Sequence, residues 1–406
     1  MVTVDKKSFT PHWFKYIDTR NQTSYKLFNN KMFKSYINHE PYNSKIKIAY
    51  FLDGIFYPTT TGMSYHIMNL LNALTNAGID TYLFRCYRGW EEPKVYEKFK
   101  FNTICIEPSI FYEDLKQISA LLISNNINVV ILDTSEVHLL QGSYFKKHLN
   151  VKLVQDVPNV DPLISKKAGL KSAVVNRQER EVLSAEKLVD IYWAKTKEDA
   201  VELENLGVTP SKVKTCGVGI DLSLFRLRDR DKLTQPIKAI YLGNMYYPPN
   251  VGGLATLEKT CLRCLEQDVI INVEVVGDGD IPHLSQKYPY LHFVGKQKDL
   301  MSLLDKYDLA FACPSYGSGI SLKILDYLAS GIPTISNDVG IRGHLDEINA
   351  SVLVDNSEEL SSSIIKLLSD AKLYKNLSNL GRSYVKKYFD INKNVSLFIK
   401  DLSDNK

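Results

Sequence analysis

The chain has 406 residues, 44% of them hydrophobic and 24% charged, which is typical of a globular protein of two or three domains. It contains no apolar run of about 18 residues and no apolar stretch behind Lys6 and Lys7, which argues against a transmembrane helix and a secretion signal. The net charge of +4 lies in residues 1–45, where eight Lys or Arg accompany three Asp or Glu, and the nearly neutral remainder disfavours a nucleic-acid partner.

Residues 1–44 form a basic extension that is rich in aromatic residues. Apolar side chains recur there at helical spacing, while Lys and Asn fall largely on the other side; the apolar set is Tyr25, Phe28, Met32, Phe33 and Tyr36. This spacing predicts an amphipathic helix. The helix packs on the body, or it contacts a membrane surface or a protein partner, and disorder is the third alternative.

A first α/β domain is predicted over residues 45–225. Apolar runs of strand length alternate there with helical stretches, and they cover residues 46–52, 81–86, 129–132, 151–154 and 191–194. The helix predicted over residues 63–77 is followed by Gly78, a residue suited to end it. Such βαβ alternation implies parallel strands joined by right-handed crossovers.

The charged segment 226–236 has few large apolar residues and is predicted to be a linker. Behind it the alternation restarts, with strands predicted at residues 238–242, 271–276, 291–294, 309–313, 334–336 and 351–354. We therefore expect a second domain over residues 237–385 and a C-terminal helix, residues 386–406, that returns to the first domain. Ligands of such sheets bind beyond the carboxyl ends of the strands, so the cleft between the domains is the expected site.

Residues 314–331 have the strongest signal for ligand binding. A Gly-rich loop with Gly317 and Gly319 follows a predicted strand and opens a helix, where free N–H groups favour a phosphate. The helix is otherwise almost entirely apolar, so its two charges, Lys323 and Asp326, need partners if it is buried. The alternative is a simple Lys323–Asp326 pair, worth only about 0.2–0.5 kcal/mol on a surface.

Other loops add weaker signals. The loop at residues 53–62 lacks the G-x-G-x-x-G spacing of nicotinamide enzymes, and Gly277 belongs to a Gly-Asp-Gly turn of a common kind. His66 follows the first loop on a helix, where packing or capping is the alternative to catalysis.

Six cysteines are scattered along the chain, and only Cys261 and Cys264 lie close together. Two ligands are too few for a structural zinc, so reduced thiols and no metal are expected.

Taken together and in their order along the chain, these motifs resemble those of the retaining GT-B glycosyltransferases of family four, in the polysaccharide-type sugar transferase subgroup. The resemblance covers about residues 45–390. Its pieces are Thr-Gly-Met-Ser-Tyr-His at 61–66, Glu-Arg-Glu at 179–181, Gly-Ile-Asp at 219–221 with Phe225, Tyr-Leu-Gly-Asn at 241–244, Val-Gly-Asp-Gly at 276–279, Phe-Val-Gly at 293–295, and 314–331.

The resemblance implies two Rossmann-like domains that face each other across a cleft, and transfer of a sugar from a nucleotide sugar. Asp326 takes the place of the acidic residue that holds the donor ribose, whereas Ser318 replaces the first acidic residue and Gln155 a His beside Asp156. The donor-binding candidates are Gly62, Gly243, Asn244, Gly277, Gly295, Gly317, Ser318, Gly319, Ile320, Ser321, Lys323 and Asp326, and the catalytic candidates are Lys323, Asp156 and His66.

These features predict a metal-independent, retaining glycosyltransferase of glycan or glycoconjugate synthesis. Its donor is a nucleotide sugar, no other cofactor is expected, and the acceptor is a glycan, a lipid-linked sugar or a protein. We expect a cytoplasmic enzyme, either free or peripheral on a membrane. A non-catalytic partner subunit of the same fold and a nucleotide-sugar epimerase are the alternatives.

Overall fold

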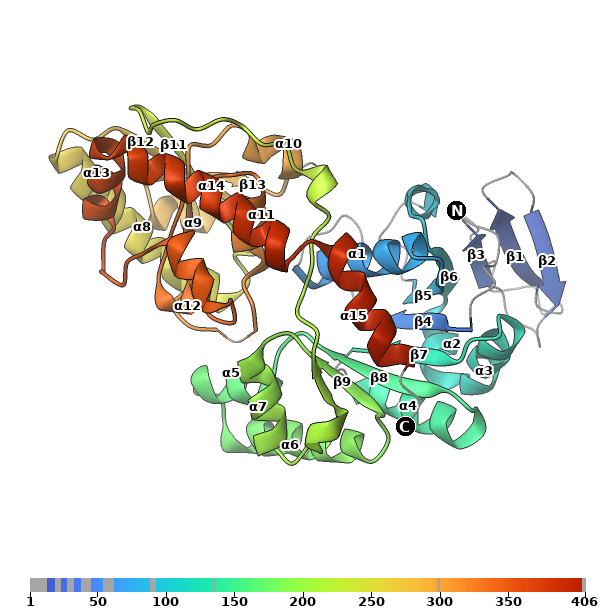
Figure 1. The fold of residues 1–406 in the computed structure, drawn as a ribbon. Coiled ribbons are helices and arrows are strands. Elements are labelled where there is room, and N and C mark those ends of the chain that lie inside the picture. Colours follow the sequence, from blue (N-terminus) through green and yellow to red (C-terminus); the bar gives the residue numbers. More distant parts are fainter. Residues whose placement is uncertain are drawn as a thin grey trace.

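A computed structural model describes residues 13–18, 23–27, 33–37, 45–53, 62–87, 93–133, 136–297, 300–317 and 319–403. They form two α/β domains, each built on one sheet with helices on both faces (Figure 1). The strand orders are β10-β9-β8-β7-β4-β5-β6-β3-β1-β2 and β13-β12-β11-β14-β15-β16. Strands β4 to β10 are parallel to one another, as are β11 to β16, which agrees with the predicted crossovers.

The first domain alternates strands and helices. Its strands are β4 (Lys47–Leu52), β5 (Asp80–Cys86), β6 (Asn102–Ile106), β7 (Val129–Leu132), β8 (Lys152–Val157), β9 (Ile191–Ala194) and β10 (Val213–Thr215). Its helices are α1 (Gly62–Asn76), α2 (Pro108–Glu113), α3 (Leu115–Ser124), α4 (Glu136–His148), α5 (Asp161–Lys167), α6 (Ser172–Glu186) and α7 (Lys197–Asn205), with short 3-10 turns at Pro93–Lys98, Pro210–Lys212 and Leu222–Leu224.

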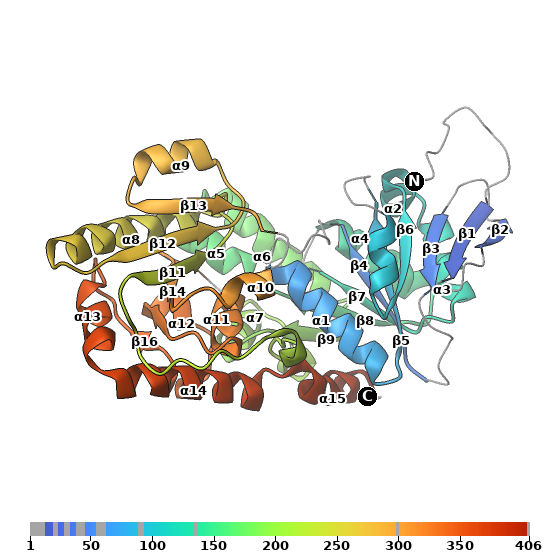
Figure 2. The ribbon, with the colours of Figure 1, turned by 90° about the horizontal axis from the view of Figure 1, so that it is seen from above.

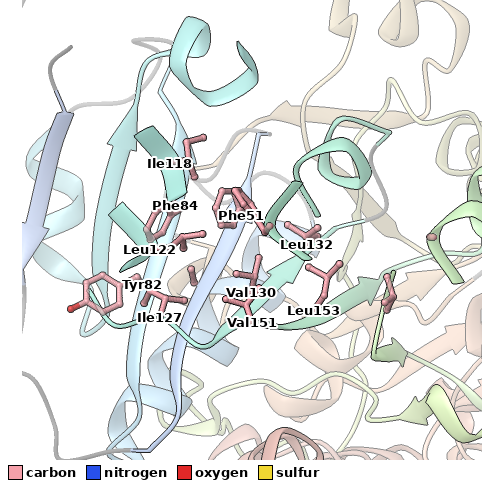
Figure 3. Close-up of a cluster of buried hydrophobic side chains, with 14 of the residues drawn as sticks. Phe51, Tyr82, Phe84, Ile118, Leu122, Ile127, Val130, Leu132, Val151 and Leu153 are labelled. Carbon is pink, nitrogen blue, oxygen red and sulfur yellow. The ribbon is translucent and has the colours of Figure 1, made fainter. Parts of the chain in front are cut away.

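Successive residues of each central strand enter opposite faces of the first sheet. Phe51 lies in a cluster with residues of α2, α3, α4, α6 and α7, and its ring stacks on Phe84 at 5.0 Å between centroids (Figure 3). Tyr50 enters the other face, which α1 covers. Because both faces are covered, the strands are apolar throughout, as their sequence predicts.

The second domain repeats this construction. Its strands are β11 (Ile237–Leu242), β12 (Ile271–Val276), β13 (Leu291–Gly295), β14 (Leu309–Ala312), β15 (Thr334–Ser336) and β16 (Leu353–Val354). Its helices are α8 (Pro248–Glu266), α9 (Ile281–Lys287), α10 (Leu300–Leu304), α11 (Leu322–Ala329), α12 (Asp338–Ile341), α13 (Ser361–Ser369) and α14 (Ala371–Tyr388), with a 3-10 turn at Asp346–Ala350. Helix α11 is buried between β14, β15 and α14, which agrees with its apolar sequence.

The helix predicted in the N-terminal extension is wrong. The described parts of residues 1–44 are strands, β1 (Trp13–Asp18), β2 (Thr23–Leu27) and β3 (Phe33–Ile37), and β3 pairs antiparallel with β6, so that the three strands extend the first sheet beyond β6. Aromatic residues favour strands, and an open sheet edge offers a ladder of unpaired backbone groups, so tertiary pairing overrides the helical spacing. Among the described helices, none is both long and apolar enough to cross a bilayer.

Two segments cross between the domains side by side. Ile220, ahead of the linker, donates its N–H to Phe389 O, and Ile391 donates to Ile220 O. The last helix, α15 (Ile391–Ser403), therefore leaves the second domain and packs beside α1 of the first (Figures 1 and 2). Phe398 is fully buried there, with its ring edge-on to Trp193 at 5.0 Å.

Candidate active site between the domains

Helix α11 carries two charged groups that do not pair with each other. Lys323 donates to Asn250 Oδ1 at 2.8 Å and lies 4.7 Å from the ring centre of Tyr241, and burial lowers its pKa to about 8. Asp326 is 6% exposed, its Oδ1 has no hydrogen-bond partner, and burial raises its pKa to about 8. A buried carboxyl without a partner is costly, so this group is suited to accept hydrogen bonds from a ligand.

Three glycines predicted for the donor site come together where strands of the second sheet end. Gly277 has φ +153°, and a Cβ there would lie 1.7 Å from Gly243 O, so only glycine fits. Gly277 N also donates to Gly295 O at 3.1 Å. Beside them, Asn244 O accepts from Asn250 Nδ2 at 3.0 Å, which links this turn to the partner of Lys323.

The first domain closes over this region with the N-terminus of α1. A Cβ on Gly62 would lie 2.9 Å from Leu322 Cδ1, so the first turns of α1 and α11 meet directly. Tyr65, on the next part of α1, joins the apolar cluster of the second domain. Burial and the nearby Asp326 carboxyl raise the pKa of Tyr65 against an opposing hydrogen bond with Asn69, so the Tyr65 hydroxyl and the unpartnered Asp326 Oδ1 lie close together between the domains.

His66 and Asp156 meet in a buried polar network that also contains Lys195 and Tyr50. The Lys195 ammonium donates to Asp156 Oδ1 and lies 3.0 Å from His66 Nε2, while Tyr50 OH donates to Asp156 Oδ2 at 2.9 Å. Burial and the Lys195 charge lower the pKa of His66, which is therefore neutral. Burial alone would raise the pKa of Asp156, but Lys195 and the hydrogen bonds outweigh it and hold the pKa well below its usual range.

His66 Nε2 faces two groups of the network, the Lys195 ammonium at 3.0 Å and Asp156 Oδ2 at 3.5 Å. The other ring nitrogen, Nδ1, is buried without a hydrogen-bond partner. Because Tyr65 and His66 are adjacent, one turn of α1 contacts both the second domain and this network.

Sequence reasoning missed Lys195 and Tyr50 as members of this network. The signal was available, because Lys195 directly follows β9 and Tyr50 lies near the end of β4, and sites of parallel sheets gather at the carboxyl ends of strands. A lysine at the end of a buried apolar strand needs a carboxylate, and Asp156 of the neighbouring strand supplies it.

The Gly-rich loop ahead of α11 is held by both domains. Gly317 O accepts from Arg342 of its own domain at 2.7 Å and from Lys167 of the first domain at 3.3 Å. Gly319 has φ +68°, and a Cβ there would lie 2.8 Å from Pro158 O. Ser321 O, next to Ile320, lies 3.3 Å from His344 Nε2. Ser318 lies outside the described residues, as do Thr59, Thr60 and Thr61 of the first loop.

Residues 236–370 match the protein family described as "Glycosyl transferases group 1". No curated protein matches the chain. The matched region contains Lys323, Asp326 and the three strand-end glycines, whereas the network around Asp156 belongs to the other domain.

Solved structures resemble the whole two-domain chain at low sequence identity. Sucrose-phosphate synthase from Thermosynechococcus elongatus has a TM-score of 0.70 at 15% identity, covering 88% of this chain and 98% of its own. HepE from Anabaena, in complex with UDP and glucose, has 0.70 at 13%, covering 89% and 100%. TarM has 0.68 at 11%, covering 89% and 99%. These likenesses establish the GT-B fold, with two Rossmann-like domains.

Proposed function

We propose that the chain transfers a sugar from a nucleotide-sugar donor to an acceptor hydroxyl, with retention of configuration, in glycan or glycoconjugate synthesis. The observation that carries this proposal is Asp326, a buried carboxyl without a hydrogen-bond partner on Oδ1, inside the region that matches the group 1 glycosyltransferases. Ribose hydroxyls would donate to it and remove its desolvation cost. HepE, which shares the fold, was solved in complex with UDP and glucose, and this supports a uridine diphosphate sugar as the first donor to test.

Lys323 and the surrounding backbone supply the electrostatics that a departing diphosphate requires. The Lys323 ammonium lies beside the strand-end turn of Gly243 and Asn244, and the Gly-rich loop presents the start of α11. Groups fixed in place before the reaction stabilise developing charge without reorganisation. In this proposal the acceptor hydroxyl gives its proton to the departing phosphate, so no separate strong base is needed.

In this proposal the first domain forms the side of the cleft that faces the acceptor. His66 is held neutral by burial and by Lys195, and its network with Asp156 fixes the turn of α1 whose Tyr65 packs against the second domain. The contact between Gly62 and Leu322 and the contact between Gly319 and Pro158 close the domains on each other. Closure excludes water and protects the donor from hydrolysis.

A donor panel read by mass spectrometry tests this function. The full chain is incubated with nucleotide sugars, with and without glycan, lipid-linked and protein acceptors, and sugar transfer is scored by the mass of the product. Asp326→Ala is expected to weaken donor binding, and Lys323→Ala to lower turnover. Isomerised nucleotide sugar without transfer would indicate the epimerase instead, and full activity in both variants would refute the site.

A further inference from the structure

Two cations from different domains converge on one carbonyl oxygen beside the glycosyltransferase site. Arg342 Nη1 lies 2.7 Å from Gly317 O, and Lys167 Nζ lies 3.3 Å from the same atom. Arg342 also pairs with Asp199, at 3.5 Å from Nη2 to Oδ1. Two carboxylates, Asp199 and Glu202, also act on this cluster, but the atom that accepts from both cations is a neutral carbonyl.

Like charges this close raise each other's free energy unless an anion lies between them. Desolvation and the Arg342 charge lower the pKa of Lys167, against an opposing effect of Glu202 and Asp199. Asp199 is fully buried and already engaged by Arg342, Thr196 Oγ1 and the Gly319 N–H. The loop itself adds no compensating charge, because residues 314–321 contain no Asp or Glu.

We propose that Lys167 and Arg342 form an anion-binding subsite that takes a phosphate or carboxylate oxygen of the substrate. An ionised oxygen is a much stronger partner for ammonium and guanidinium groups than a peptide carbonyl, so it would take over the bonds that Gly317 O now accepts. Arg342 retains 19% exposure and Lys167 lies at the surface, so a substrate group can reach both. The inference rests on the proposed function, because it adds a substrate contact to that site.

The anionic oxygen can come from either of two substrate groups, the donor diphosphate or a carboxylate on the donor sugar. Isothermal titration of the full chain at fixed ionic strength measures the affinity for pyrophosphate, UDP, GDP and ADP, and for UDP-glucose against UDP-glucuronate. The variants are Lys167→Met and Arg342→Gln, with Lys167→Arg as the conservative exchange. Lys166→Met is the matched control, since Lys166 lies on the same helix but pairs with Glu179 at 2.7 Å.

Wild type is expected to bind pyrophosphate or UDP-glucuronate, with about tenfold loss in Lys167→Met and in Arg342→Gln. Lys167→Arg should keep most of the affinity, and Lys166→Met all of it. A loss that extends to UDP or another nucleoside diphosphate assigns the subsite to the diphosphate. A loss confined to UDP-glucuronate assigns it to a sugar carboxylate.

The subsite is refuted if wild type binds neither pyrophosphate nor UDP-glucuronate, or if both charge-removing variants bind as wild type does. Unfolding temperatures of the variants, read alongside, separate lost contacts from lost folding, and Lys167 provides the cleaner measurement because it is exposed. Sugar transfer with unchanged anion binding in the variants would refute this inference alone. Lost pyrophosphate binding in a protein that transfers no sugar would refute the proposed function alone.

Discussion

The ligand-free protein is expected to be destabilised near neutral pH by the buried carboxyl group of Asp326, which ionises more readily in the unfolded chain. Its pKa is raised by burial from an ordinary 3.8 to about 8, so the folded state favours the protonated acid. The folded state gains most from this group below pH ~4, and that contribution is lost as the pH rises toward about 8. At pH 7 the folded protein holds a proton that the unfolded chain has released, and this costs about 4 kcal/mol of folding stability, at 1.36 kcal/mol for each pH unit above the ordinary pKa.

The perturbation is Asp326→Asn, which keeps the shape and the polar group but cannot ionise. Relative to wild type, the variant should gain stability by about 1.4 kcal/mol for each pH unit between pH ~4 and ~8, and level off above. Urea unfolding at pH 5, 6, 7 and 8 measures this slope, and Asp346→Asn, an exposed carboxylate of the same domain, is the control with a flat difference.

The same variant should bind UDP or its preferred nucleotide at least tenfold more weakly, because the ribose loses an ionised acceptor. Gained stability with lost affinity is the signature of a group kept for function. A stability difference that does not change with pH would refute the reasoning, since it would mean that the carboxyl is hydrated or paired in the folded protein.

Three further predictions concern the glycine contact, the buried ion pair and the last helix. Gly319→Ala should lower turnover at least tenfold in steady-state kinetics, because its Cβ would clash with Pro158 O at a positive φ. Asp156→Asn should cost about 3–5 kcal/mol in denaturant unfolding because it leaves the Lys195 ammonium buried without a charged partner; a loss below 1 kcal/mol would contradict the ion pair. Phe398→Ala should destabilise the first domain by about 3–5 kcal/mol while nucleotide binding by the second domain persists in titration.

Where burial covers both sides of a sheet, the sequence predicts the elements well. The apolar runs at residues 129–132, 191–194 and 271–276 coincide with β7, β9 and β12, because a doubly covered strand has little freedom of composition. Strand β6 (Asn102–Ile106) was missed, since its polar residues Asn102 and Thr103 break the apolar run even though both are buried.

Features set by distant partners were not predictable in the same way. The charged segment 226–236 has no helix or strand, in keeping with a linker, but its charges do not predict that Arg230 is 3% exposed and donates to Ser330 O at 2.7 Å and Tyr307 O at 3.2 Å. The extension at residues 33–37 has helical spacing but pairs as a strand with β6. In both cases the structure depends on hydrogen bonds to backbone atoms far away along the chain, and the spacing of nearby residues cannot predict those partners.

The residues of the candidate site likewise fall into those with a local sequence signal and those without one. Lys323 and Asp326 stand out because charges are rare on an apolar helix behind a Gly-rich loop, and in the structure Asp326 is buried while Lys323 is half-buried over the Tyr241 ring. The interdomain contacts of Lys167 and Arg342 have no such local signature, because they depend on how two domains meet.

The position of α15 also sets an order for folding during synthesis. The apolar face that Ile391, Val395, Phe398 and Leu402 cover includes Trp193 and residues of α1, all made long before residue 391. The first domain therefore cannot bury this strip until the last residues of the chain have been made. A chain cut before residue 391 keeps the helices of the second domain but exposes apolar surface on the first, which favours aggregation.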